Sequence, residues 1–221
     1  MIGDSYMDLG NVGPTIMMDA NNATYRTYYL AGAALYYGSG QGNIVYQFDS
    51  MAVPANPDIK VVIMDGGGND ILENNSQCLN IPPAGDTMCH MVVDTSVATG
   101  LMLEKDMASK GVQAIVYFFY PHVDPTSRPN AGDWDDYGAV GASAACCGAG
   151  NVPSGPDLTC EGNGPGIQCV FVDTRPEFEG HNLPSSTDYW FQADGIHPNQ
   201  PGANAIAGKV WAQMQKYCIA Q

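Results

Sequence analysis

Ser5 is the first residue of the sequence whose side chain could carry out covalent chemistry. It follows Gly3 and Asp4, and a serine placed where a helix begins lies near backbone N–H groups that stabilise negative charge. Such a hydroxyl could attack a carbonyl carbon once a base removes its proton. A Gly-Asp-Ser triplet is common, however, and by itself it more often marks a helix cap.

A second segment pairs a carboxylate with an imidazole. Asp194 and His197 stand three residues apart in a turn that contains Gly195. At this spacing the carboxylate can reach the ring and hold it in one tautomer, which a general base requires. Taken alone, the same pattern also fits a surface turn.

A third segment offers a neutral hydrogen-bond donor. Asn69 follows three consecutive glycines, residues 66–68, at the end of an apolar run. Glycine lets the backbone approach a ligand closely, and the amide N–H of Asn69 could stabilise an oxyanion. An asparagine at this place is equally well a turn or a helix cap.

In this order along the chain, the three segments resemble those of the SGNH hydrolase family, also called the GDSL family. That family has a serine near its N-terminus, a glycine in a second segment, a third segment close to Gly-x-Asn-Asp, and a final Asp-x-x-His. The matching positions in this sequence are Ser5, Gly32, Asn69, Asp194 and His197. Gly32 is favoured for the second segment, although Gly38 and Gly40 follow closely.

The resemblance implies a serine hydrolase that cleaves carboxylic esters of short- to medium-chain acyl groups. It makes Ser5 the nucleophile, His197 the general base and Asp194 the residue that orients the histidine. The N–H groups of Ser5 and Gly32 and the side chain of Asn69 would form the oxyanion hole. No cofactor is required, and the substrate would be a small-molecule, glycan or lipid ester.

Other functions fit the same residues. A carbohydrate O-deacetylase or an acyltransferase would use the same triad, because pocket shape sets the choice of acceptor. A noncatalytic module could keep the fold and only hold a ligand. Covalent labelling of Ser5 would separate the enzymes from the binding module, because labelling needs an activated nucleophile.

A few further residues could take part in chemistry. His122 follows a predicted strand, where parallel-sheet proteins place residues that face ligands, so it is a candidate for substrate binding. Ser143 lies in a near copy of the Gly-x-Ser-x-Gly nucleophile motif, but alanine replaces the last glycine. The acidic group around Trp134, at 133, 135 and 136, lacks the glycine and glutamate of an EF-hand loop. We therefore predict no metal site.

Composition limits the partners and the location. The formal net charge is -15 at pH 7, which repels nucleic acid and anionic lipid surfaces. The sequence contains no run of 18 uncharged apolar residues that would predict a membrane span. Oligomeric state is not predicted from this composition.

Seven cysteines indicate an oxidising compartment. The pairs 78 and 89, and 160 and 169, are close in sequence and suggest loops closed by disulfides. The pairing of Cys146, Cys147 and Cys218 stays open, and at least one thiol must remain unpaired. We therefore predict a secreted or periplasmic protein, although the sequence shows no signal peptide.

Hydrophobic patterns predict one α/β domain over residues 1–221. Strands are expected at 59–64, 112–120 and 167–173, and helices at 92–110 and 201–218, with weaker helices at 22–36 and after Ser5. Alternating strands and helices predict a three-layer α/β/α sandwich with a mostly parallel central sheet, the flavodoxin-like arrangement of SGNH hydrolases. Residues 121–166 are expected to form a loop region held by disulfides.

The leading strand is the one departure from the family pattern that affects the fold. The family leads into its serine with a full central strand, but only Met1 and Ile2 precede Gly3. Two residues are too few for such a strand. We therefore expect the first strand to be truncated in this sequence.

Overall fold

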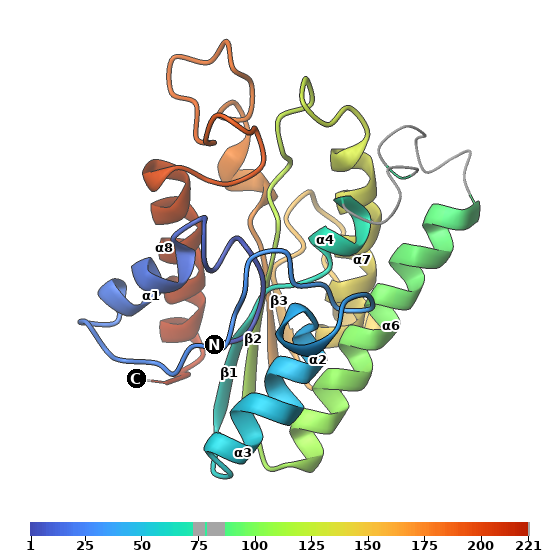
Figure 1. Cartoon of the computed structure of the whole chain (residues 1–221), viewed down its shortest axis with the longest axis vertical. Helices are drawn as coiled ribbons and strands as arrows, with labels where there is room; N and C mark the ends of the chain where they lie inside the picture. The colour runs from blue at the N-terminus through green and yellow to red at the C-terminus, as the bar shows by residue number, and fades with distance from the viewer. Residues whose placement is uncertain (73–77, 79–86, 221) are drawn as a thin grey trace.

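A four-stranded, mostly parallel sheet forms the centre of the protein (Figure 1). The computed structural model describes residues 1–72, 78 and 87–220. The strands are β1 (Val61–Met64), β2 (Ala114–Phe119), β3 (Cys160–Gly162) and β4 (Gln168–Asp173). Their order is β1-β2-β4-β3, and only β3 runs antiparallel to its neighbour. The three strands predicted from apolar runs are confirmed, with shorter bounds.

Helices cover both faces of this sheet. The α-helices are α1 (Val12–Asp19), α2 (Ile44–Tyr46), α3 (Val53–Ala55), α4 (Gly68–Leu72), α6 (Thr87–Ser109), α7 (Ala131–Cys147) and α8 (Gln200–Lys216). A π-helical stretch, Gln47–Ala52, joins α2 to α3, and short 3-10 turns occur at Gly40–Gly42, Ala149–Asn151 and Arg175–Phe178. In Figure 1, α1 and α8 lie on one side of the sheet and α6 and α7 on the other. The predicted three-layer α/β/α sandwich is therefore confirmed.

The sequence of β2 explains its central place. All six of its residues are buried, as expected for a parallel strand with helices on both faces. It pairs with β1 on one side and β4 on the other. The carboxyl ends of these three strands therefore meet along one edge of the sheet. None of the helices in the described ranges is long and apolar enough to cross a membrane.

The expectation of a loop region over residues 121–166 is wrong in its central part, because α7 occupies Ala131–Cys147. Glycine and alanine in this stretch suggested a loop, but here they allow close packing between helices. A Cβ atom on Gly141 would lie 3.0 Å from Val97 Cγ2 of α6. Trp134, Ala142 and Cys146 recur at helical spacing and are buried.

The predicted helix over residues 22–36 is also wrong. This stretch runs largely without regular structure beside the N-terminal residues. The Tyr28 N–H donates to Met1 O at 2.9 Å, and the Leu30 N–H donates to Gly3 O at 3.1 Å. Tyrosine and threonine are plentiful here and favour extended backbone over helix. The helix expected after Ser5 is present as α1.

The N-terminal residues take the place next to β1 where a leading strand was expected. Ile2 forms an isolated parallel bridge with Met64, and its N–H donates to Ile63 O at 3.2 Å. The buried side chain of Gln47 exchanges two hydrogen bonds with the backbone of Gly3, at 2.7 and 2.9 Å. This amide therefore satisfies backbone groups that a neighbouring strand would otherwise pair.

The structure contains three disulfides among the described residues, two of which join α7 to the sheet. They join Cys78 to Cys89, Cys146 to Cys169 and Cys147 to Cys160, and Cys218 is free. The first matches the prediction, but a bridge between Cys160 and Cys169 is wrong. In the antiparallel pair of β3 and β4, Cys160 faces Phe171 while Cys169 faces Gly162. The end of α7 instead brings its two adjacent cysteines against these strands.

Candidate active site

The residues around Ser5 pack directly against the loop that contains His197. Ser5 is buried at the start of the turn that leads to α1. The next residue, Tyr6, donates its hydroxyl to Ile196 O at 2.6 Å, and its ring centroid lies 6.3 Å from that of His197. A bond from Gln192 Nε2 to Leu9 O, at 3.0 Å, also joins the two segments. The fold thus brings the first and last predicted segments together.

Asp194 and His197 form the predicted pair. His197 Nδ1 lies 2.6 Å from Asp194 Oδ2. The other carboxylate oxygen accepts the N–H groups of Ile196 and His197, at 2.9 and 3.0 Å. Burial by itself would raise the pKa of Asp194, but the bonds from the imidazole and these N–H groups outweigh it and lower the pKa. The carboxylate therefore stays ionised and fixes the Nδ1–H tautomer of the ring.

Asp70 positions the segment that contains Gly32. Its buried carboxylate accepts the N–H groups of Leu35, Tyr36 and Tyr37, at 2.8 to 3.1 Å. Gly32 itself has a φ of 78°, a left-handed conformation that disfavours any side chain. Asp70 follows Asn69 in the sequence motif, and its role could have been inferred only from the fold.

Two backbone donors, at Ser5 and Gly32, have no protein acceptor among the described residues. Gly32 is exposed, but Ser5 is buried, and buried N–H groups are nearly always paired. An unpaired N–H at Ser5 is what an oxyanion hole needs before its ligand arrives.

Asn69 lies beside Asp4, at the first turn of α4. Its Nδ2 lies 3.1 Å from Asp4 Oδ2 and 2.8 Å from Ala33 O. Both amide hydrogens therefore point to protein acceptors in this structure. The side chain is held close to the segment that contains Ser5, but it is not a free donor like the two backbone groups.

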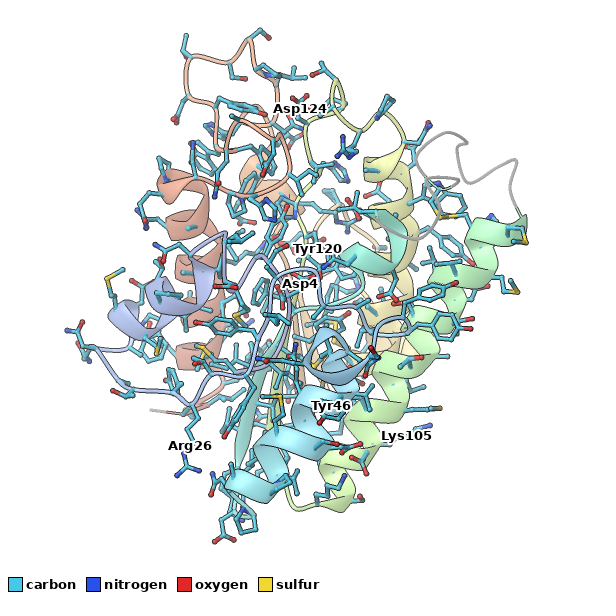
Figure 2. The ribbon with its side chains drawn as sticks, in the orientation of Figure 1. Asp4, Arg26, Tyr46, Lys105, Tyr120 and Asp124 are labelled. Carbon is cyan, nitrogen blue, oxygen red and sulfur yellow. A yellow bond between two sulfur atoms is a disulfide. The ribbon has the colours of Figure 1, made fainter. Side chains whose placement is uncertain are left out.

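Asp4 accepts hydrogen bonds from three sides. Besides Asn69, it receives the Tyr6 N–H at 3.0 Å and the Tyr120 hydroxyl at 2.5 Å. Figure 2 shows Asp4 and Tyr120 close together near the end of the sheet. Sequence reasoning assigned no role to Asp4 or Tyr120. The signal for Tyr120 was its place directly after β2, where parallel strands present residues to a site.

His122 lies at the same edge of the sheet, in a cavity of about 440 Å³ lined also by Asp136, Arg175 and Phe178. Its Nε2 is 2.7 Å from Asp136 Oδ1. This hydrogen bond outweighs partial burial and raises the pKa of His122. Arg175 is held by Asp173, with Nε 2.8 Å from Oδ1. The cavity wall therefore carries paired charges next to apolar side chains.

The other candidate residues from the sequence are Ser143 and the acidic group around Trp134. Ser143 is buried within α7, and its hydroxyl donates to Leu158 O at 3.0 Å, so it is not presented to solvent. Asp135 is buried, which raises its pKa to about 8, while Asp136 pairs with His122. In the described ranges, the one group close enough to share an ion is Glu104 with Cys146 and Cys169, whose sulfurs are joined in a disulfide.

Comparisons of the sequence find no matching family model and no matching curated protein. Solved structures do match the fold. A GDSL-like lipase from Bacteroides thetaiotaomicron gives a TM-score of 0.58 at 13% identity, covering 98% of this chain and 86% of the lipase. A lipase/acylhydrolase from Enterococcus faecalis gives 0.55 at 16% identity, covering 98% and 94%. An alpha/beta hydrolase enzyme from the metagenome of Lake Arreo, Spain, gives 0.56 at 16%, covering 97% and 93%. The chain thus has the fold of GDSL-type hydrolases.

Proposed function

We propose that this protein is a serine hydrolase that cleaves carboxylic esters at Ser5. The observation that carries the proposal is the Asp194–His197 pair, joined to the serine's segment by the bond from Tyr6 to Ile196. Structures with this fold include a lipase and an acylhydrolase, which supports ester hydrolysis in general. The exact substrate follows from the pocket and not from the fold.

The proposed reaction begins when Ser5 Oγ attacks the ester carbonyl carbon. His197 Nε2 accepts the hydroxyl proton, and Asp194 stabilises the imidazolium through the bond to Nδ1. The tetrahedral intermediate collapses, the bond to the leaving oxygen breaks, and His197 returns the proton to the alcohol. Water then attacks the acyl-enzyme while His197 accepts a proton from it. The proton passes to Ser5 Oγ as the bond to the acyl group breaks, and the acid is released.

The oxyanion is stabilised by the Ser5 and Gly32 N–H groups and by Asn69. The two backbone donors have no protein acceptor in the described part of the chain, so no hydrogen bond within the protein has to break when they bind the oxyanion. Asn69 must exchange one of its present bonds, to Asp4 or to Ala33 O, for a bond to the oxyanion. We expect the bond to Asp4 to be released, since it is the longer of the two.

His122 contributes to substrate binding in this proposal. It lies two residues after Tyr120, and the cavity that it lines has room for a short- to medium-chain group or a ring, although Ser5, Asp194 and His197 do not line it. A His122→Ala enzyme should show a raised KM with a nearly unchanged kcat for esters that fill the cavity, and unchanged constants for acetate esters. Equal effects on all esters would remove His122 from substrate binding.

Three disulfides in one chain support export to an oxidising compartment. A secreted or periplasmic location is therefore part of the proposal. It predicts that the protein is recovered active from a periplasmic or extracellular expression route and that the pairs resist mild reduction.

The experiment that tests the function uses p-nitrophenyl esters from acetate to decanoate. The wild-type protein, Ser5→Ala and the matched control Ser39→Ala, at an exposed serine, are assayed together. Activity should be lost in Ser5→Ala and kept in the control. An organophosphonate should add its mass to Ser5 alone. Wild-type protein with neither turnover nor labelling would instead be a binding module, and product esters formed when an alcohol is added would show acyl transfer.

A further inference from the structure

A pair of buried carboxyl groups lies directly behind the nucleophile. Asp4 and Asp65 are 1% and 0% exposed. Asp65 follows the last residue of β1, and its Oδ1 accepts the Asp4 N–H at 2.8 Å. Gly3 makes this approach possible, because a Cβ atom there would lie 1.6 Å from Asp65 Oδ1. The proposed mechanism gives Asp65 no role.

Because Asp65 Oδ1 accepts the backbone N–H of Asp4, the two buried carboxyl groups lie close together where water is excluded. Two carboxylates placed in this way repel each other, so one of the pair must hold a proton. Among the described residues, Asp65 Oδ2 has no conventional donor. A proton on Asp65 that is donated to Asp4 would satisfy this atom.

The donors around each group decide which of them keeps the proton. Asp4 accepts bonds from Tyr120, Asn69 and the Tyr6 N–H, and these stabilise its ionised form. Burial raises the pKa of Asp65 well above its usual range, and the charge on Asp4 raises it further, although the backbone N–H groups of Asp4 and Met7 oppose the shift. Burial also raises the pKa of Asp4, but its hydrogen bonds oppose the shift. The shared proton therefore lies on Asp65.

We propose that Asp65 is a positioning residue of the oxyanion hole, which donates its proton to Asp4 and so leaves the Asn69 amide available to the oxyanion. The inference rests on the proposed function. Asp4 and the oxyanion compete for the same N–H of Asn69, at present 3.1 Å from Asp4 Oδ2. A proton from Asp65 weakens Asp4 as an acceptor. It also limits the negative charge that faces the developing oxyanion.

The groups that face the pair are mostly neutral acids. The charge of Asp4 or Asp65 raises the pKa of four tyrosines: Tyr6 in the N-terminal turn, Tyr117 and Tyr120 in β2 and just after it, and Tyr29 in the neighbouring extended segment. The charge of His197 lowers the pKa of Asp4. In the part of the chain that the structure describes, no lysine or arginine forms a salt bridge with either carboxyl group. Ionising Asp65 would therefore place a second, uncompensated charge beside Asp4.

Two substitutions separate the proton's role from packing. Asp65→Asn keeps an oxygen for the Asp4 N–H and supplies a permanent N–H donor to Asp4. Asp65→Leu has the same branched shape, with larger methyl groups in place of the two oxygens, but neither polar group. We expect Asp65→Asn to keep kcat within about threefold, and Asp65→Leu to lose roughly ten- to a hundredfold in kcat with little change in KM, part of the loss typical for an oxyanion donor. Where Asp65→Leu does not fold, infrared difference spectra supply the test.

The infrared measurement compares wild type with Asp65→Asn at pH 7. Wild type should show the carbonyl stretch of a protonated carboxylic acid that the variant lacks. Identical spectra, or an Asp65→Leu enzyme as fast as wild type, would overturn the inference. The rate of Ser5 labelling by an organophosphonate is measured in parallel. Failure of wild type to label overturns the proposed function itself, whereas normal labelling in Asp65→Leu overturns only the role of Asp65.

Discussion

Removing the Tyr120 hydroxyl tests whether Asp4 is a buried anion held by its donors. Tyr120→Phe keeps the ring, which packs under Gly68 and against Tyr6. It deletes only the 2.5 Å bond to Asp4 Oδ2. Hydrogen bonds to charged groups contribute about 1.5–3 kcal/mol. Both residues of the bond are buried, so water cannot replace the lost donor.

The expected result follows from this value. For a domain of this size, each kcal/mol lowers Tm by about 2–4 °C, so Tyr120→Phe should melt roughly 3–12 °C below wild type. Urea unfolding should give a lower midpoint with an unchanged slope. The kcat should also fall, because Asp4 then competes more strongly for Asn69.

Tyr46→Phe is the matched control. Tyr46 is 43% exposed and lies on α2, away from the Asp4–Tyr120 pair (Figure 2). Exposed substitutions of this kind usually change stability by less than about 0.5 kcal/mol. If Tyr120→Phe and Tyr46→Phe unfold at the same urea concentration, Asp4 does not depend on the Tyr120 hydroxyl, and the account of the buried carboxylates is wrong.

Three further predictions test other parts of the structure. Asp194→Asn should lower kcat by roughly 10⁴-fold with intact folding, because the histidine loses its fixed tautomer. Ester-hydrolysis rates measure the loss, and circular dichroism spectra check that the variant is folded. Burial raises the pKa of Glu104 from 4.5 to about 8, so its contribution to stability falls as pH rises from about 4.5 toward 8. Glu104→Gln should therefore exceed wild type in stability by up to roughly 3 kcal/mol at pH 7, with the advantage gone at pH 4, as urea unfolding at both pH values would show. Non-reducing peptide mapping should recover the pairs Cys146–Cys169 and Cys147–Cys160. Finding Cys160 joined to Cys169 would contradict the placement of the end of α7 against β3 and β4.

The parts of the fold that sequence could predict are those with a strong local signal. The apolar run over Ala114–Phe119 predicted a buried parallel strand, and the run before Asp65 predicted β1. Helix α8 was expected from proline in its first turn and the spacing of Ile206 and Val210. In each case, the burial of one continuous apolar pattern determines the secondary structure of the segment.

The failures came where tertiary packing decides. Glycine and alanine over Ala131–Cys147 suggested a loop, yet they let α7 approach α6 closely. Tyr28 and Leu30 pair with backbone at the N-terminus, and no local signal shows that long-range bond. The disulfide partners of Cys160 and Cys169 depend on the register of β3 and β4, which proximity in sequence does not reveal.

The residues of the candidate site also differ in whether the sequence could predict their positions. Residues that act through local geometry, Asp194 and His197, could be placed together from their spacing alone, and the structure gives them a 2.6 Å contact. Asp65 could not be identified, because in sequence it only marks the end of a strand. Its proximity to Asp4 depends on Gly3 and on the parallel pairing of Ile2 with Met64. A carboxyl group that tunes its neighbour by holding a proton is therefore found from burial and distance, which sequence patterns do not encode.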